Sequence, residues 1–203
     1  ILSEQGLVVA KALKDQPSFK FQLPSQTLTD GKAGKSGAIS IMRDGKSNGK
    51  TAVFKYTSHG LAHGHYDKLS LIFYDEGNEI LADYGASRYL NVPQKYGGRY
   101  LQENKTFAKQ SIAHNNLIVD EMSHFNGSYK LSSAHHPEEY FKDFDSDKSY
   151  QVVSAKEHNA YPSVTVHRTV LMLSETSISN DILIEVVRTE VKDNANHTKD
   201  LPY

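Results

Sequence analysis

Apolar and polar residues alternate along most of the chain after residue 37, with the period of two that is typical of half-buried β-strands. The segments 38–43 and 51–56 flank a stretch with Asp44-Gly45 and Asn48-Gly49, dipeptides that favour a hairpin. A second hairpin is predicted from the strand with Leu69, Leu71 and Phe73, which turns at residues 76–78 into the strand 80–84. Further strands are predicted at 116–120, 150–155, 163–173 and 182–191. Many short strands with turn signals between them predict an antiparallel β-sandwich.

The chain begins differently. Residues 2–14 are helix formers with rough helical periodicity, which indicates the end of a helical region. The segment 25–37 is rich in Gly, Thr, Ser and Lys and is the best candidate for a linker. We therefore expect a helical remnant with its linker over residues 1–35 and a β-sandwich domain over residues 36–203.

One long segment, residues 86–110, lacks a regular pattern. Loops of this length inside a compact domain are usually functional or disordered, and the aromatic residues in this one disfavour disorder. Its cations outnumber its acids, because Glu103 is the only acidic residue beside Arg88, Lys95, Arg99, Lys105 and Lys109. Cations pair with carboxylates and aromatic faces can stack on sugar rings, so this loop could bind an acidic sugar. A solvated loop with a few anchoring aromatics is the alternative.

Composition limits the other possibilities. The chain has 203 residues, 38% of them hydrophobic, and a formal net charge of −1, which argues against disorder and against a globally basic nucleic-acid binder. It has no cysteine, so a metal would need His, Asp or Glu as ligands. No apolar run approaches the ~20 residues that span a bilayer. The sequence starts at Ile1, shows no signal peptide and ends without a polar tail, so we expect it to be a piece of a longer protein.

Histidines and one carboxylate suggest a metal site. His63 and His65 are two residues apart, so on a strand both would point to the same face. Asp83 lies near the end of the following hairpin strand, and His114 begins the strand after the long loop. Two histidines and a carboxylate suit zinc, with water completing a tetrahedron. Ligands on different strands have no sequence signature, however, so histidines satisfied by core hydrogen bonds remain an alternative.

The order of several short motifs resembles the C-terminal β-sandwich part of heparinase II/III-like polysaccharide lyases. It is closest to the alginate and oligoalginate lyases of polysaccharide lyase family 17. The resemblance is specific from about Ser36 to Glu121 and weaker beyond. The motifs are His-Gly-His-Tyr-Asp at 63–67, Ala-Asp-Tyr-Gly at 82–85, Lys-Tyr-Gly-Gly-Arg-Tyr at 95–100 and Ala-His-Asn at 113–115.

This resemblance implies roles for particular residues. His65, Asp83 and His114 match the ligands of a zinc ion that is usually regarded as structural. Tyr100 matches a catalytic tyrosine and His63 a histidine beside the substrate. Arg88 matches an arginine that contacts substrate, and Arg99, in the cationic loop, is expected to bind substrate with it.

The resemblance also implies a reaction. Such enzymes cut uronate-containing polysaccharides by β-elimination, which needs a neutraliser for the carboxylate, a base near C5 and an acid for the leaving oxygen. Family members carry upstream an incomplete toroid of α-helices that supplies an Asn-His pair and a second tyrosine. We therefore expect half of a cleft here, a partner toroid in the parent chain, a periplasmic or secreted location, and no activity for this chain alone.

Two alternatives stay open. One is a heparin- or heparan-type lyase, because the His-Gly-His core is shared across the superfamily. The other is a non-catalytic, sugar-binding β-sandwich with a structural metal, which composition and pattern permit equally well.

Overall fold

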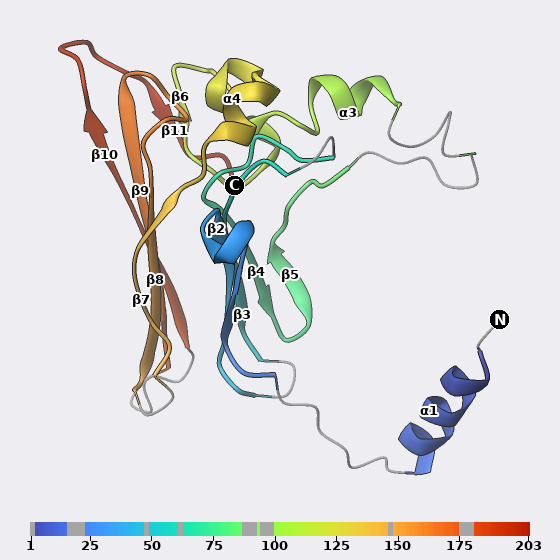
Figure 1. Ribbon diagram of the computed structural model, residues 1–203. Helices are drawn as coiled ribbons and strands as arrows, with labels where there is room; N and C mark the ends of the chain where they lie inside the picture. Colours follow the sequence, from blue (N-terminus) through green and yellow to red (C-terminus); the bar gives the residue numbers. More distant parts are fainter. Residues whose placement is uncertain are drawn as a thin grey trace.

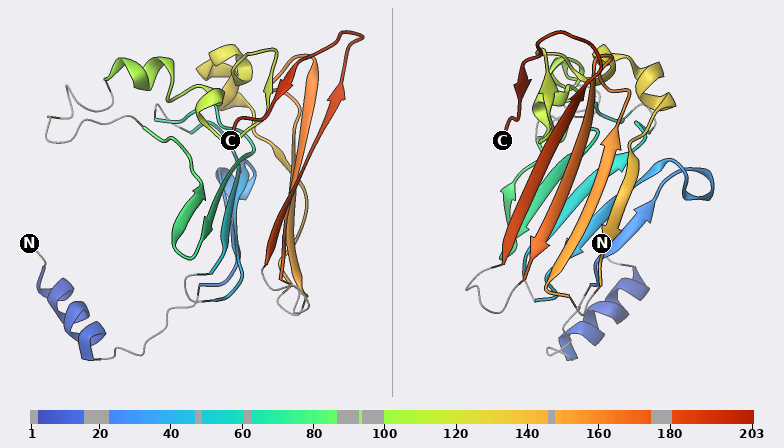
Figure 2. Two further views of the ribbon diagram at one scale, coloured as in Figure 1. Left: turned by 180° about the vertical axis from the view of Figure 1, so that it is seen from behind. Right: turned by 90° about the vertical axis from the view of Figure 1, so that its left-hand side faces the viewer.

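Two antiparallel β-sheets lie face to face and form a sandwich (Figures 1 and 2). The structure is a computed structural model that describes residues 3–15, 23–46, 49–60, 63–86, 93, 100–145, 148–174 and 181–203. Within these residues, the strands make up most of the regular structure and the helices are few and short. The mainly-β, antiparallel sandwich predicted from the alternating pattern is confirmed.

The first sheet has the strand order β1-β2-β3-β4-β5, so each strand pairs with its neighbour in sequence. In β2 and β3 every second residue is buried, as the period of two requires. The tight turn between β4 and β5 places Glu76 and Gly77 at φ 50° and 78°, the left-handed region that such a hairpin turn needs. The bounds are β1 Gln26–Thr29, β2 Gly37–Arg43, β3 Thr51–Thr57, β4 Ser70–Asp75 and β5 Asn78–Leu81.

The second sheet has the order β10-β9-β8-β7 and is also a meander. Strands β9 and β10 pair over ten residues, from Leu173 opposite Ile182 to Val164 opposite Val191. Strand β7 has a register shift between Glu139 and Phe141, and most of its residues are exposed, which fits its place at the edge. The bounds are β7 Glu138–Asp143, β8 Tyr150–Glu157, β9 Val164–Leu173 and β10 Ile182–Val191.

The core lies between the two sheets. Phe54 and Tyr56 of β3 are fully buried, as are Val153 of β8 and Val170 of β9. The hydroxyl of Tyr56 donates to Glu139 Oε2 of the opposite sheet at 2.7 Å, so its one polar atom is satisfied. Full burial of one such side chain stabilises the folded state by about 1.5–3 kcal/mol. The apolar layer between the sheets therefore makes the sandwich a stable scaffold for the loops at its end.

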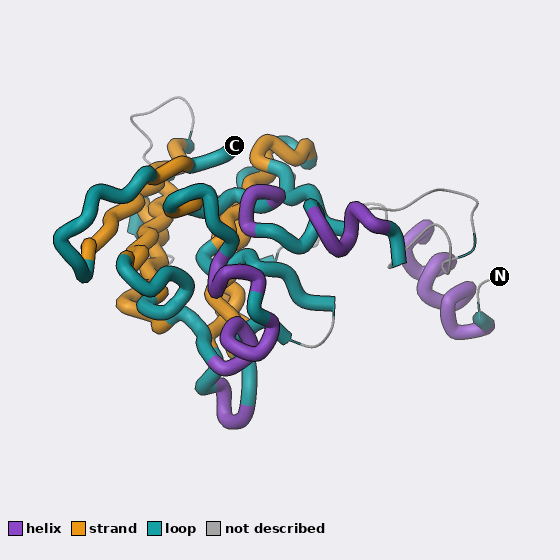
Figure 3. Tube along the Cα trace, turned by 90° about the horizontal axis from the view of Figure 1, so that it is seen from above, coloured by secondary structure: helices purple, strands orange, loops and turns teal. Residues whose placement is uncertain are grey.

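Short helices and turns gather at one end of the sandwich, as Figures 1 and 3 show. The chain between β5 and β7 forms most of this layer. The strand β11 returns to it from the C-terminal side and pairs with β6. These elements are α3 Gln102–Thr106, η2 Ser111–Ala113, β6 Ile118–Val119, η3 His124–Gly127, α4 Tyr129–Ala134 and β11 Lys199–Asp200.

The helix predicted near the N-terminus is present, but part of the segment predicted as a linker forms a strand of the first sheet. The helix α1, Glu4–Asp15, falls where helical periodicity predicts it. Strand β1 and the short helix η1, Lys32–Gly34, lie inside the segment expected to be a linker, and β1 pairs with β2. The first sheet therefore begins at Gln26 rather than after residue 35. No helix in the described ranges is long and apolar enough to cross a membrane.

Candidate active site and metal centre

The histidine-rich segment forms the loop between β3 and β4, not the strand on which a shared face for His63 and His65 was expected. Gly64 makes this loop possible by its close approach to the backbone of His59. A Cβ at position 64 would lie 1.8 Å from the His59 carbonyl oxygen, so only glycine fits. The loop is therefore folded back on itself, and the positions of both histidines depend on packing rather than on strand alternation.

The loop is tied to the segment that follows α3. Tyr66 donates its backbone N–H to the Lys109 carbonyl oxygen at 2.9 Å, and its hydroxyl donates to the Gly127 carbonyl oxygen. The buried Ser111 hydroxyl donates to the Tyr66 carbonyl oxygen and accepts from the backbone N–H of His124. These bonds satisfy buried backbone groups of two irregular segments at once and so fix one segment against the other.

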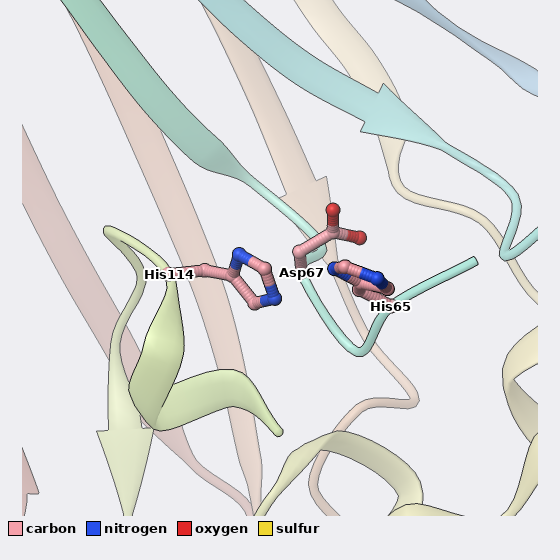
Figure 4. Close-up of side chains that lie close together, drawn as sticks. All are labelled: His65, Asp67 and His114. Atoms are coloured by element: carbon pink, nitrogen blue, oxygen red, sulfur yellow. The ribbon is translucent and has the colours of Figure 1, made fainter. Parts of the chain in front are cut away.

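His65 and His114 meet where these two segments touch (Figure 4). Their ring centroids are 5.0 Å apart, and His114 is 2% exposed. One ligand atom each of His65, Asp67 and His114 lie within 4.8 Å of one another. Asp67 is held by an ion pair with Lys55 of β3, which partly neutralises its carboxylate.

Asp83 also reaches this group. Its Oδ2 lies 2.8 Å from Nδ1 of His114, and its Oδ1 accepts the backbone N–H of Gly85 at 2.8 Å. The side-chain amide of Asn115 donates to the carbonyl oxygens of Leu71, at 2.9 Å, and Ala82, at 2.7 Å. Asn115 therefore joins the segment that carries His114 to the segment that carries Asp83.

The charges of the cluster suit metal ligands. Burial and the neighbouring His114 lower the pKa of His65, which favours the neutral imidazole. Burial opposes ionisation of Asp83, but the hydrogen bond and charge of His114 outweigh it and hold the pKa of Asp83 below its ordinary value. A neutral imidazole at His65 and an ionised carboxylate at Asp83 are protonation states that bind metal.

The two ring nitrogens of His114 offer two positions for a cation. Nε2 of His114 has no hydrogen-bond partner among the described residues, although it is excluded from solvent. Its other nitrogen, Nδ1, lies 2.8 Å from Asp83. A cation bound through Nδ1 would have this carboxylate as a further ligand, whereas for a cation bound through Nε2 Asp83 would be the partner of the opposite ring nitrogen. The donor set of imidazoles and carboxylates without thiolates is one that zinc accepts, so the residues present fit a zinc ion.

A cavity of about 280 Å³ lies beside this cluster. It brings together Tyr100 and both histidines of the loop, which the sequence analysis had selected from separate motifs. Tyr100 and His63 are exposed, so a large ligand can reach them. The lining residues are His63, His65, Ala86, Tyr100, Asn104, Lys105 and Lys109. A larger hollow of about 610 Å³, beside Gln110 and Met122, contains none of the candidate residues, so the chemistry favours the smaller cavity.

The structure thus brings His63, His65, Asp83, Tyr100 and His114 to one end of the sandwich. Arg88 and Arg99 lie outside the described residues. The sequence analysis did not select Asp67, although it stands in the quoted His-Gly-His-Tyr-Asp motif, nor the cavity residues Asn104, Lys105 and Lys109. The excess of cations in residues 86–110 was the signal for the two lysines.

Two comparisons with known sequences bear on this site. The family described as heparinase II/III-like, C-terminal, matches residues 26–192. An exo-oligoalginate lyase of Saccharophagus degradans is 47% identical over 202 residues, which are 99% of this chain and 27% of that protein. An alginate lyase of Stenotrophomonas maltophilia is 42% identical over 93% of this chain and 25% of that protein. The chain therefore spans about a quarter of the length of these relatives.

Solved structures agree on the fold. The heparan sulfate lyase HepC of Pedobacter heparinus superposes with a TM-score of 0.57 at 14% identity, over 83% of this chain and 25% of that one. The heparinase III BT4657 gene product with methylated lysines gives a TM-score of 0.60 at 15% identity, over 91% and 27% of the two chains. At this identity the likeness concerns the sandwich alone.

Stability should fall as the pH falls from about 6.5 to about 4. Burial, with the nearby charge of Lys68, lowers the pKa of His59 to about 4 from an ordinary value of 6.5, and burial lowers that of His124 to about 3. The unfolded chain therefore binds these protons first, so the stability that neutral His59 contributes is present above pH 6.5 and is lost below it. Urea unfolding at pH 7.5 and pH 5 measures the difference.

Replacing His59 should make this pH dependence shallower. In His59→Gln the loss of stability between the two pH values should be smaller than in the wild type, with the remainder due to the other histidines of lowered pKa, His65, His124 and His167. His158→Gln removes an exposed histidine and serves as the matched control. If the pH dependence of the unfolding free energy were the same in His59→Gln as in the wild type, its attribution to His59 would be wrong.

Proposed function

Because the chain belongs to the heparinase II/III-like C-terminal family, we propose that it is the β-sandwich part of a lyase that cleaves alginate-type uronate chains by β-elimination. The observation that carries the proposal is the cavity lined by Tyr100, His63 and His65, the last of which contacts His114. Two relatives are 42–47% identical to this chain over 93–99% of its length. One is named an exo-oligoalginate lyase and the other an alginate lyase, which supports an alginate-type substrate. In this proposal the lyase activity is that of the longer parent protein, of which this chain is one part.

β-Elimination on a uronate removes the proton on C5, which is α to the carboxyl group, and expels the oxygen on C4. Negative charge builds toward the carboxylate during this step, so the enzyme must supply donors there as well as a base and an acid. A tyrosine hydroxyl can carry a proton to the leaving oxygen or take one from C5, and a histidine can assist it. These are the groups that line the cavity.

We assign the proton transfer to Tyr100, with His63 beside the substrate as the second catalytic group. Arg88 and Arg99 bind carboxylates of the acidic polysaccharide in this proposal. The donors that neutralise the reacting carboxylate come from a helical toroid elsewhere in the parent chain. An acidic extracellular polymer as substrate is consistent with a periplasmic or secreted enzyme, which is part of the same proposal.

A zinc ion, bound by His65, Asp83 and His114, would brace this site. The 2.8 Å approach of Asp83 to Nδ1 of His114, with His65 beside the same ring, supports a cation shared by these three residues. The ion would supply structural cross-linking rather than chemistry, because it would join the β3–β4 loop, the end of β5 and the segment after η2. Asp67, which also lies in ligand reach, is already paired with Lys55 and would stay outside the coordination sphere.

In the full-length parent protein, Tyr100→Phe should lower turnover by roughly 10²–10⁴-fold and leave substrate binding nearly unchanged, since only the proton-carrying oxygen is removed. The absorbance of the new C4–C5 double bond measures turnover on oligoalginate. Tyr140→Phe, an equally exposed tyrosine on β7, is the control and should keep wild-type turnover. A Tyr100→Phe enzyme with more than about a third of wild-type turnover would remove Tyr100 from catalysis.

Purified protein should contain near-stoichiometric zinc, and a chelator should lower its melting temperature. An ion bound only by the folded state stabilises it by about 3 kcal/mol at a hundred times its Kd. Elemental analysis and thermal unfolding, each with and without chelator, measure both effects.

Paired aspartate variants test the ligand assignment. Asp83→Ala should lose most of the zinc, whereas Asp67→Ala should keep it, because the lysine already neutralises Asp67. The reverse pattern would transfer the third ligand to Asp67. Protein that binds no zinc after reconstitution would end the metal proposal.

A further inference from the structure

The helix α3 and the turn that follows it place two lysines at the cavity that contains Tyr100. Asn104 is 5% exposed and Ala108 is fully buried, so these two residues anchor the helix on the sandwich. Lys105 and Lys109 follow them directly in the sequence, and both line the cavity. Residues four apart on a helical turn lie on the same side, and the backbone bonds of Phe107 and Ala108 to Glu103 continue the turn beyond Thr106.

The backbone of Lys109 is fixed to the histidine loop. Its carbonyl oxygen accepts the N–H of Tyr66, which lies between His65 and Asp67 in the sequence. The lysine is half-buried, whereas Lys105 is exposed. Both lysines line the cavity, and the backbone of Lys109 is the part fixed against the histidine loop.

The charge of the cavity is one-sided. Among the described residues that line it, two carry ammonium groups and none carries a carboxylate, although acids and bases nearly balance over the whole chain. A cavity with cations and hydroxyl, amide and imidazole groups suits an anion with neighbouring hydroxyls. A uronate sugar has this chemistry.

We infer that Lys105 and Lys109 form a subsite for the carboxylate of a uronate next to the one that reacts, an inference that rests on the proposed lyase function. Stabilising the reacting carboxylate needs donors that are fixed before the reaction. A lysine is a flexible point charge on a long stem, and an exposed one is poorly suited to that task. Such a charge binds substrate and transition state equally, so it lowers KM and leaves kcat unchanged.

The same flexibility has a consequence for specificity. Mannuronate and guluronate differ in the configuration of C5, and so in the direction of the carboxylate. A planar arginine fork selects one geometry, whereas an ammonium on four methylene groups can follow the carboxylate in either. The subsite should therefore recognise the charge of the neighbouring sugar and not its epimer.

Steady-state kinetics of the full-length protein test the inference. The double variant Lys105→Gln, Lys109→Gln should raise KM for oligomannuronate and oligoguluronate by a similar factor of about ten, the loss of one charge-assisted hydrogen bond. Its kcat should stay within about twofold of the wild type. Added salt should weaken wild-type kcat/KM more than that of the variant.

Two further variants control for charge and folding. Lys199→Gln removes an exposed cation on β11, away from the cavity, and should change neither constant. The charge-conserving pair Lys105→Arg, Lys109→Arg should recover most of the lost KM, which a merely structural role for the lysines would not predict. An unchanged KM in the glutamine double variant, or a loss confined to kcat, would overturn the inference.

Failure of the lyase proposal would look different. A wild-type protein that releases no unsaturated product from any uronate oligomer would refute the lyase function and leave the lysines to be tested by binding. Titration calorimetry with oligomannuronate then decides between the outcomes. Weaker binding in the glutamine double variant than in Lys199→Gln supports the subsite, and equal binding removes it.

Discussion

The amide of Asn115 holds the candidate site together. It donates one hydrogen bond to the Leu71 carbonyl oxygen of β4 and one to the carbonyl oxygen of Ala82, the residue before Asp83. Asn115 follows His114 directly in the sequence, and Asp83 follows Ala82. The buried Asn115 side chain therefore fixes the backbone on both sides of the 2.8 Å contact between His114 and Asp83. Without its two donors, buried carbonyl groups would be left unsatisfied at a cost of about 1–3 kcal/mol each.

A second buried group extends this connection to the other sheet. Arg168 of β9 is 1% exposed, and its Nη1 donates to the carbonyl oxygens of Leu69, at 2.6 Å, and of Asn115. Its Nε lies 2.9 Å from Glu185 of β10, so its charge is paired inside the sandwich. The apolar interlayer gives the fold its stability, while Asn115 and Arg168 determine where the irregular segments lie on it. A rigid scaffold with positioned loops is the arrangement that a catalytic site requires.

Strand alternation in the sequence was sufficient to predict the sandwich and most of its strands. The match for β10 is complete, and the hairpin from β4 to β5 was predicted from its turn residues. Strand β7 was missed because its exposed residues do not alternate, and β1 because it is short and lies among turn-forming residues. A strand was predicted over residues 116–120, but only the two-residue strand β6 forms there. The backbone groups next to it make their hydrogen bonds within the loops instead.

The candidate site was less predictable than the fold. The family resemblance selected His63, His65, Asp83, Tyr100 and His114, and the structure brings them to one end of the sandwich. Alternation alone placed the histidine pair on a strand, whereas the contact of Gly64 with the His59 backbone bends it into a loop. Contacts between segments distant in sequence, such as Tyr66 with Lys109, have no local signal. Asp67 therefore emerged only from the structure, and the excess of cations in residues 86–110 indicated Lys105 and Lys109 without placing them at the cavity.

The central claim is that this sandwich supplies one wall of a lyase cleft and that the parent protein supplies the other. Its most direct test compares the isolated 203-residue chain with the full-length protein on mannuronate, guluronate and heparan sulfate oligomers. The measurement is the absorbance of the unsaturated product. The account predicts turnover of the alginate oligomers by the full-length protein and none by the isolated chain, because losing even one preorganised donor typically costs ~10²–10³ in rate. Turnover by the isolated chain, or none by the full-length protein, would contradict it.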